Sequence, residues 1–429
     1  MVATALEAPS LASGVVSVSE STLVEGSLEA YRRELTGYCY RMLGSGFEAE
    51  DAVQETMVRA WRHAADFEGR SSVRSWLYRI ATNVCIDMHR QVQRRARPME
   101  MGPASPPDES FLGPMYPEEH WITPIPDAKA GPETTDPAEL AQYRDSIRLA
   151  FVTALQHLPA RQRAALILCE VLRWQATEVA ELLDTSVAAV NSALQRARAT
   201  LGSLSFDARP APLGDADTAL LERYVDAFER YDVERLVTLL REDAVQSMPP
   251  FAMWVQGAEN IGRFMLEPGP SACRGSVLVP TSANGSPAFG QYKPDHAGGH
   301  MPWGLQVIEV NDGRISGIQC FLAPLEPVRL FPQFGLPLHL DRAASAEAFA
   351  GVPVSRRRPF SHPGAPGRRH RPARSAPGDR APVRRRRRHL RRAGSRGSDG
   401  TASRPSPCRV VPRPARRSMR SPRRRARTR

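Results

Sequence analysis

The stretch from residue 48 to residue 97 constrains this chain most, because an acidic helix pattern runs directly into a basic one. Small and apolar residues recur at three- and four-residue steps over 48–63, which predicts a helix with one buried stripe. The face opposite that stripe is acidic, and a surface of that charge can bind a basic protein partner. Its outward residues are Glu50, Asp51, Gln54 and Glu55.

The second half of the stretch, from Phe67 to Arg97, has the opposite charge. It holds seven arginines against two acidic residues, a net charge of +5, and its apolar stripe predicts a helix over 73–95. Aromatic and amide side chains lie among the arginines, so this segment can hold a nucleic-acid backbone and stack or hydrogen-bond bases. The alternative is a helical bundle with a charged surface and no partner.

Charge is distributed unevenly along the 429 residues. From residue 355 onward there are 27 arginines and two acidic residues, a net charge of +25, which leaves −13 for the remainder because the whole chain carries +12. The aperiodic composition of 355–429, rich in Arg and Pro, predicts a disordered tail. It is either a nucleic-acid-binding arm or, as we favour, the product of frameshifted or read-through translation of GC-rich DNA. Residues 1–26 are expected to be a disordered leader.

Cysteine spacing and apolar content exclude several classes of protein. The six cysteines are scattered without paired spacing, so we expect neither a metal nor another cofactor. No apolar run approaches the ~18 residues of a membrane helix, and the N-terminus lacks the basic and apolar regions of a signal peptide. We therefore expect a cytoplasmic protein with reduced thiols and no membrane contact.

Residues 98–139 are predicted to be a linker. They contain ten prolines and nine acidic residues against one lysine, a composition that favours extended backbone over a packed core. Trp121 and Ile122 are costly to expose within such a segment. They either pack on a neighbouring domain or, as part of an acidic strand, enter a basic cleft of a partner.

Helical periodicity returns over 140–203. Two of its helices, 176–183 and 187–201, are joined by a short polar connection in which Thr185 or Ser186 is the expected N-cap, as in a helix-turn-helix. The second helix begins with small residues and presents polar ones outward, so it can approach a DNA groove; a generic helical hairpin would share this pattern. The candidate DNA-contacting residues are Ser186, Ala188, Ala189, Asn191, Ser192, Gln195, Arg196 and Arg198.

The helical segments 48–97 and 140–203 resemble parts of one protein family. DAVQETMVRAW followed by FEGRSSVRSWLYRIATNVCIDMHR resembles regions 2.2 to 2.4 of the extracytoplasmic-function sigma factors, within the sigma-70 family. LPARQRAALILCEVLRWQATEVAELLDTSVAAVNSALQRARATL resembles region 4 of the same family. The resemblance implies two all-α sigma domains, region 2 over 27–97 and region 4 over 140–203. In that family the linker between them enters the polymerase channel that later holds RNA.

The resemblance also implies a role for each surface. The acidic face would dock on the β′ coiled coil of core RNA polymerase, and the polymerase β flap is a second implied partner. The helix-turn-helix would read the −35 element of promoter DNA. The unpaired −10 element and its phosphates would be held by Phe67, Arg70, Ser71, Ser72, Trp76, Arg79, Asn83, Arg90, Arg94 and Arg95.

The order of helix and strand patterns over residues 214–326 predicts an α+β domain in which helices precede an antiparallel sheet. The segment Asn311–Asp312–Gly313 is a hairpin signal between its last two strands. This order resembles the SnoaL-like cone of the nuclear-transport-factor-2 superfamily, and NGSPA at 284–288 resembles a motif of sigma-G and sigma-J type factors that carry this domain. Residues 327–354 follow as an apolar tail that should dock on a folded surface.

Some relatives with this cone are isomerases or hydrolases that use a carboxylate or histidine base. The candidates in this chain are Asp243, Asp295, His296 and His300. Because fold analogy cannot carry an activity, we assign no catalytic residue and favour a pocket for a small apolar ligand.

Our leading hypothesis is a promoter-recognition subunit, not an enzyme, whose C-terminal domain regulates its activity. The alternatives are a SnoaL-like small-molecule enzyme fused to a DNA-binding module, and a helix-turn-helix repressor. Run-off transcription with core polymerase separates the three, because only a sigma factor confers promoter-specific initiation.

Overall fold

The computed structural model describes residues 28–64, 67, 71–89, 94–132, 134, 136–204, 215–267, 273–322 and 327–341. The predicted leader (1–26) and arginine-rich tail (355–429) lie outside these residues. Among the residues described, no helix combines the length and apolar content needed to cross a membrane.

Three helices form the first domain: α2 (Arg32–Leu43), α3 (Gly46–Arg62) and α4 (Val73–His89). After α2, Gly44 has a φ of 73°, the left-handed conformation that glycine tolerates best. α3 begins at once because the Ser45 side chain accepts a hydrogen bond from the Glu48 amide. The predicted apolar stripe of α3 is buried in the core that α2 and α4 complete.

The acidic linker is packed against the rest of the chain. It forms four short helical turns: α5 (Pro98–Met101), η2 (Glu109–Phe111), η3 (Glu118–His120) and α6 (Asp127–Ala130). Trp121 and Ile122 are 2% and 1% exposed, so the structure adopts the packed alternative for these two residues. The Thr123 amide donates to the Gly44 carbonyl, which fastens the linker to the first domain.

The second helical domain contains α7 (Pro137–Ile147), α8 (Leu149–Leu155), α9 (Ala160–Leu166), the π-helical turn η4 (Ile167–Val171), α10 (Ala176–Leu182) and α11 (Val187–Gly202). A buried arginine joins this domain to the first. Arg163 donates hydrogen bonds to the carbonyl oxygens of Met42 and Leu158 and to Gln156 Oε1. Burial lowers the pKa of Arg163 to about 10, so the guanidinium stays charged at neutral pH.

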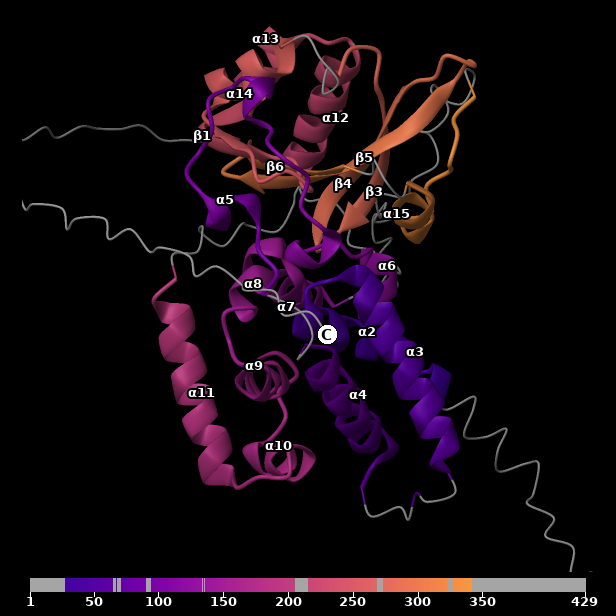
Figure 1. Cartoon of the computed structure of the whole chain (residues 1–429), viewed down its shortest axis with the longest axis vertical. Helices are drawn as coiled ribbons and strands as arrows, with labels where there is room; N and C mark the ends of the chain where they lie inside the picture. The colour runs from indigo at the N-terminus through magenta and orange to yellow at the C-terminus, as the bar shows by residue number, and fades with distance from the viewer. Residues whose placement is uncertain are drawn as a thin grey trace, which may run out of the picture. The chain divides into compact units, whose positions relative to one another are not determined.

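The C-terminal domain is a six-stranded sheet with helices on one face (Figure 1). The helices are α12 (Asp215–Glu229), α13 (Val233–Leu239) and α14 (Ala258–Leu266). The strands are β1 (Leu240–Ser247), β2 (Trp254–Gln256), β3 (Val277–Ala283), β4 (Ser286–Pro294), β5 (His300–Asn311) and β6 (Arg314–Leu322), in the order β2-β1-β6-β5-β4-β3.

The predicted hairpin at 311–313 is confirmed, since Asn311 pairs with Arg314 across the β5–β6 turn. The expectation of a wholly antiparallel sheet is wrong, because β1 runs parallel to β6. The chain passes through β2 to β5 before β6 returns beside β1, and so long a connection permits a parallel pair.

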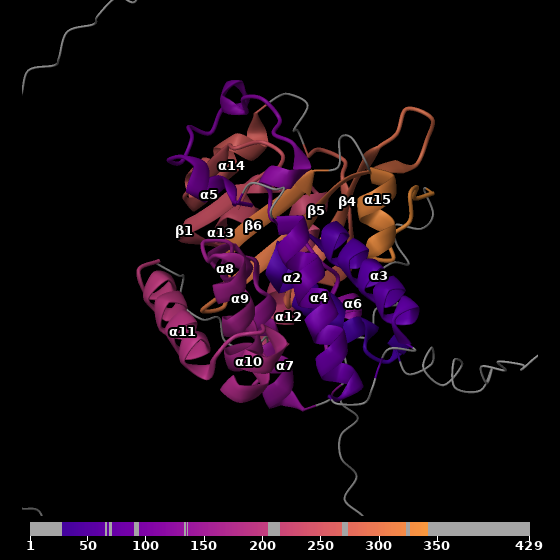
Figure 2. The same ribbon diagram turned by 60° about the horizontal axis from the view of Figure 1, so that its bottom comes forward.

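The other face of the sheet is covered by α15 (Pro327–Gln333) and by the helical domains (Figure 2). Phe331 of α15 packs edge-on against Tyr292 of β4, with ring centroids 5.1 Å apart. Leu340 then exchanges backbone hydrogen bonds with His300. The described part of the predicted apolar tail therefore docks on this sheet, while its last residues lie outside the description.

Candidate nucleic-acid and polymerase interfaces

Helix α4 carries three of the ten residues predicted to bind the −10 element, and the others lie just before or after it. Ser72 starts the helix, because its Oγ accepts a hydrogen bond from the Ser75 amide at 3.0 Å. Trp76, one turn on, is half-buried against the ring of Phe67, with 5.0 Å between the centroids. Exposed positions on α4 and just before it are Ser71, Ser72, Arg79 and Asn83. Arg70 and Arg90 lie outside the described residues.

The two arginines beyond α4 are engaged within the chain. Arg94 is exposed, and its Nη1 lies 2.8 Å from Nδ1 of His157, whose ring also contacts Glu100 at 2.9 Å. Arg95 is 3% exposed and holds the linker by donating to the carbonyl oxygens of Glu118 and Trp121. In this conformation Arg95 is a buried residue that fastens the linker, and its role as a phosphate contact stays a prediction.

Helices α10 and α11 adopt the predicted helix-turn-helix arrangement. Asp184, with a φ of 48°, turns the chain between them, and Ser186 Oγ caps α11 by accepting from the Ala189 amide. A hollow of about 350 Å³ opens at this turn, between the start of α11 and Glu181 of α10. Among the predicted −35 residues, Ser192 is half-buried and the others are exposed: Ser186, Ala188, Ala189, Asn191, Gln195, Arg196 and Arg198.

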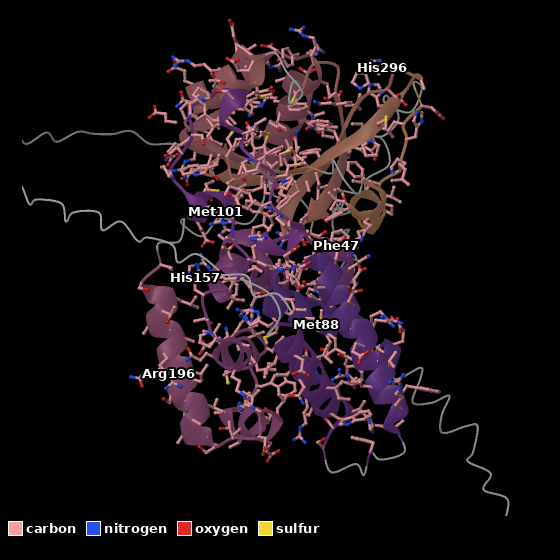
Figure 3. All side chains as sticks on the ribbon, viewed as in Figure 1. Phe47, Met88, Met101, His157, Arg196 and His296 are labelled. Carbon is pink, nitrogen blue, oxygen red and sulfur yellow. The ribbon has the colours of Figure 1, made fainter. Side chains whose placement is uncertain are left out.

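The side chains along α11 divide into two groups. Arg196 points away from the rest of the chain (Figure 3), and its Nη1 donates to Ser192 Oγ at 2.6 Å. Arg198 is paired with Glu170 of η4. The outward face therefore presents neutral polar groups and one extended guanidinium, a combination suited to base edges and phosphates.

The predicted polymerase face of α3 is partly covered. Asp51 and Gln54 are exposed, and Glu55 pairs with Arg59 one turn along the helix at 2.7 Å. Glu50 is instead bonded to Lys129 of α6 and lies 3.5 Å from the amide nitrogen of Gln333 in α15. The linker and the C-terminal segment thus meet at the N-terminal end of this acidic face.

The two predicted DNA-binding elements contact each other directly. Arg79 of α4 donates to the Glu181 carbonyl of α10 at 2.9 Å. Tyr78 packs on Trp174 with ring centroids 5.0 Å apart, and the Arg74 guanidinium lies over both rings. In this conformation α4 and the helix-turn-helix form one closed unit.

Comparison with known proteins places these elements in a family. The Sigma-70 region 2 model matches residues 28–95, the Sigma-70 region 4 model matches 148–201, and the SnoaL-like domain model matches 221–318. The ECF RNA polymerase sigma factor SigG of Mycobacterium tuberculosis H37Rv is 43% identical over 315 residues, which are 72% of this chain and 82% of SigG. The chain belongs to the extracytoplasmic-function sigma factors of RNA polymerase.

Two further similarities concern the sigma factor SigJ of the same organism. The SigJ sequence is 28% identical over 248 residues, covering 56% of this chain and 70% of SigJ. The SigJ crystal structure, at 24% identity, covers 73% of this chain and 99% of that chain with a TM-score of 0.45. Sigma factors bind core RNA polymerase and promoter DNA. Helix α4 lies within the part of this chain that matches sigma-70 region 2, and α11 lies almost wholly within the part that matches region 4.

In this sigma factor, the β3–β4 turn joins all three folded parts. Asn284 is fully buried, and its Nδ2 donates to Tyr40 Oη at 2.7 Å and to the Ile147 carbonyl at 2.8 Å. Its Oδ1 accepts from the Ile125 amide at 3.0 Å. One side chain therefore binds the region 2 domain, the linker and the helix α7. The NGSPA resemblance marked this position, but its partners lie too far away in sequence to be predicted.

A half-buried carboxylate completes this junction. Asp127 Oδ1 accepts from the Gly285 amide at 2.7 Å and from Tyr143 Oη at 3.2 Å. Burial raises the pKa of Asp127 above the usual range for a carboxyl group, although these hydrogen bonds and the nearby Arg144 oppose that rise. Burial also raises the pKa of the Tyr143 phenol.

The interior of the SnoaL-like domain holds a chain of hydrogen-bonded polar side chains, and the four candidate bases lie outside this chain. Tyr224 Oη donates to Gln306 Oε1 at 2.7 Å, and Gln306 Nε2 donates to Gln291 Oε1 at 2.8 Å. Asp243 is exposed and pairs with Arg241, and His296 lies at the outer end of the β4–β5 connection (Figure 3). His300 bonds the Gly275 carbonyl at 3.2 Å, and the Asp295 carboxylate accepts from the Ala297 amide of its own turn.

Proposed function

We propose that this sigma factor contacts the β′ coiled coil of core polymerase through α3 and the β flap through its region 4 domain. The exposed Asp51 and Gln54 support the first contact, because they offer an acidic and polar surface to a basic partner. The −10 element would be held by the exposed residues of α4 together with Phe67 and Trp76. The −35 element would be read by the outward residues of α11. Because sigma factors work with polymerase, we expect the protein in the cytoplasm.

We further propose that the SnoaL-like domain regulates initiation by holding the sigma domains closed. The single observation that carries this proposal is the buried Asn284, whose side chain bonds the region 2 domain, the linker and α7 at once. We propose that α4 and α11 separate when the −10 and −35 elements are bound together, which breaks the Arg79–Glu181 contact. Any interaction that stabilises the closed state therefore opposes promoter binding.

We propose that the domain acts without catalysis. The hydrogen-bonded chain in its interior joins hydroxyls and amides, and the four candidate bases lie outside that chain, whereas a proton-transfer enzyme needs a carboxylate or imidazole beside its substrate. A small-molecule enzyme or a helix-turn-helix repressor could use some of these elements, but neither explains the matched pair of sigma regions in this order.

Run-off transcription with purified core polymerase tests the proposal. Gln195→Ala or Arg196→Ala should each weaken −35-dependent initiation by about 1–3 kcal/mol equivalent, with unchanged circular dichroism. Arg263→Ala, which removes an exposed cation of α14, is the matched control. Equal transcription from promoters with intact and scrambled −35 elements would contradict the assignment.

Two further sets of variants test the polymerase contact and the regulation. Reversing both Asp51 and Glu55 to arginine should preserve folding and reduce co-purification with core polymerase.

Deleting residues 326–429 should change transcription several-fold, deletion from residue 205 should change it differently, and Trp121→Ala should reproduce part of the effect. Identical activity of all these chains at equal concentration would show that the C-terminal domain does not regulate transcription.

A further inference from the structure

The linker between the sigma domains runs along the rim of the SnoaL-like domain, beside β1 and α14 (Figure 1). The Ser105 amide donates to the Trp254 carbonyl at 2.8 Å, and Trp254 Nε1 returns a hydrogen bond to the Gly102 carbonyl at 2.9 Å. Farther along, the Tyr116 amide donates to the Pro250 carbonyl at 2.9 Å. Backbone bonds thus hold both ends of segment 102–116 on this domain.

Between these two attachments the linker inserts a single helical turn, η2. The Asp108 side chain caps the turn by accepting from the Ser110 amide, and the Leu112 amide donates to the Glu109 carbonyl at 3.0 Å. Leu112 packs against the apolar core of the SnoaL-like domain. Burial lowers the pKa of Lys293 and raises that of Cys273; the nearby charge of Glu109 opposes the first shift and adds to the second, so Glu109 lies near both groups. The turn therefore brings an apolar side chain and a carboxylate to the rim.

The domain meets this turn with complementary chemistry. Lys293 Nζ lies 3.5 Å from the centroid of the Trp303 ring, which fixes the cation at the rim. Just inside, Gln291 Nε2 is 3.1 Å from Ser276 Oγ and 3.5 Å from Cys273 Sγ, and Gln291 continues the hydrogen-bonded chain that leads to Tyr224. Lys293 can bind an anionic group, and the apolar core beside it can bind an apolar one. Together they suit an amphipathic anion.

We propose that this rim is a binding site for a carboxylate on an apolar body, and that the linker turn Glu109–Leu112 occupies it as an internal ligand. Glu109 supplies the carboxylate that faces Lys293, and Leu112 supplies the apolar group. A free apolar carboxylate and the linker then compete for one site, so binding of the first releases the second. The effect of this release on transcription rests on the proposed function, whereas the competition itself does not.

Hydrogen exchange on the full-length chain, without polymerase, tests the competition with decanoate as the probe. The reporters are the Ser105 and Tyr116 amides, which bond the rim, and the control is the Thr123 amide, which bonds the first domain. Decanoate should accelerate exchange at both reporters several-fold and leave Thr123 unchanged. Decan-1-ol, which lacks the carboxylate, should act far more weakly.

Two variants and one control sharpen the test. Lys293→Met should abolish the difference between decanoate and decanol, whereas Arg263→Met, at an exposed cation of α14, should preserve it. Glu109→Gln weakens the internal ligand, so half-maximal acceleration should occur at several-fold lower decanoate. Unchanged exchange at the reporters, equal effects of decanoate and decanol, or acceleration that includes Thr123 would each overturn the proposal. None of these outcomes depends on run-off transcription, so failure of the proposed function would be seen separately.

Discussion

The β3–β4 and β5–β6 turns of the sheet share one backbone conformation but differ in the burial and contacts of their side chains. Asn284 and Gly285 have φ values of 55° and 70°, and Asp312 and Gly313 have 53° and 69°. Both are two-residue loops with positive φ at each position, the type I′ geometry that Asn-Gly and Asp-Gly favour. The Asn284 side chain is buried among three parts of the chain, whereas the Asp312 side chain is 95% exposed.

The contrast separates what a turn sequence specifies from what the tertiary structure adds. The β5–β6 turn only reverses the chain. The β3–β4 turn does the same and also supplies the hydrogen bonds that hold the sigma domains, the linker and the sheet together. Equivalent substitutions in the two turns therefore isolate the interdomain contribution, because the backbone strain is common to both.

The largest effect is expected for Asn284→Ala. The substitution leaves the Ile125 amide, the Ile147 carbonyl and Tyr40 Oη each without one partner, at roughly 1–3 kcal/mol for each buried group, so at least about 3 kcal/mol together. Exchange at the Thr123 amide, which reports linker release, should accelerate at least about a hundredfold. Asp312→Ala is the control and should leave that amide unchanged; equal acceleration by both variants would show that strain alone is responsible.

A smaller effect is expected for the paired glycine variants. A Cβ on Gly285 would lie 2.8 Å from Arg144 Cα, whereas a Cβ on Gly313 would meet nothing within 4 Å. Both alanines carry the left-handed penalty of about 1–2 kcal/mol, but only Gly285→Ala must also displace α7. Thermal unfolding should therefore show the lower midpoint for Gly285→Ala. Equal midpoints would mean that α7 can move aside for the new Cβ without loss of stability.

The sequence predicted the elements whose signals are local. The stripes of α3 and α4, the Ser186 cap and the β5–β6 turn each depend on neighbouring residues, and all occur in the structure. The parallel β1–β6 pair depends on strands far apart in the chain, and the sequence did not indicate it. The burial of Arg95 could not be predicted either, because the carbonyl groups that it contacts lie 23 and 26 positions away in the sequence.

The junction lay beyond prediction for the same reason. Asn284 and Tyr40 are 244 positions apart, and nothing local to either indicates the other. Asp127 lies in a linker whose composition favours solvation, yet it is half-buried because α6 packs against the strand that leads into the β3–β4 turn. The candidate DNA-binding residues were found from local pattern and resemblance, whereas the contacts that close the molecule required the structure.

The smallest and most specific effect is expected from pH, because Asp127 bonds the buried turn and has no counterpart at the exposed one. Its raised pKa means that the folded junction binds a proton more tightly than the unfolded chain does. This contribution to stability is fully present below the unfolded carboxyl pKa of about 4 and is lost as the pH rises through the folded pKa.

Asp127→Asn tests this pH dependence because it keeps an oxygen for the Gly285 amide and the Tyr143 phenol but has no proton to lose. Exchange at Thr123 in the wild-type chain, corrected for the intrinsic effect of pH, should therefore accelerate as the pH rises above the unfolded carboxyl pKa of about 4. The same profile should be flatter in the variant, and Asp312→Asn at the exposed turn should retain the wild-type slope. A wild-type profile that is flat, or that slopes in the opposite direction, would show that Asp127 is ionised throughout and that its burial is fully offset by Arg144 and the hydrogen bonds.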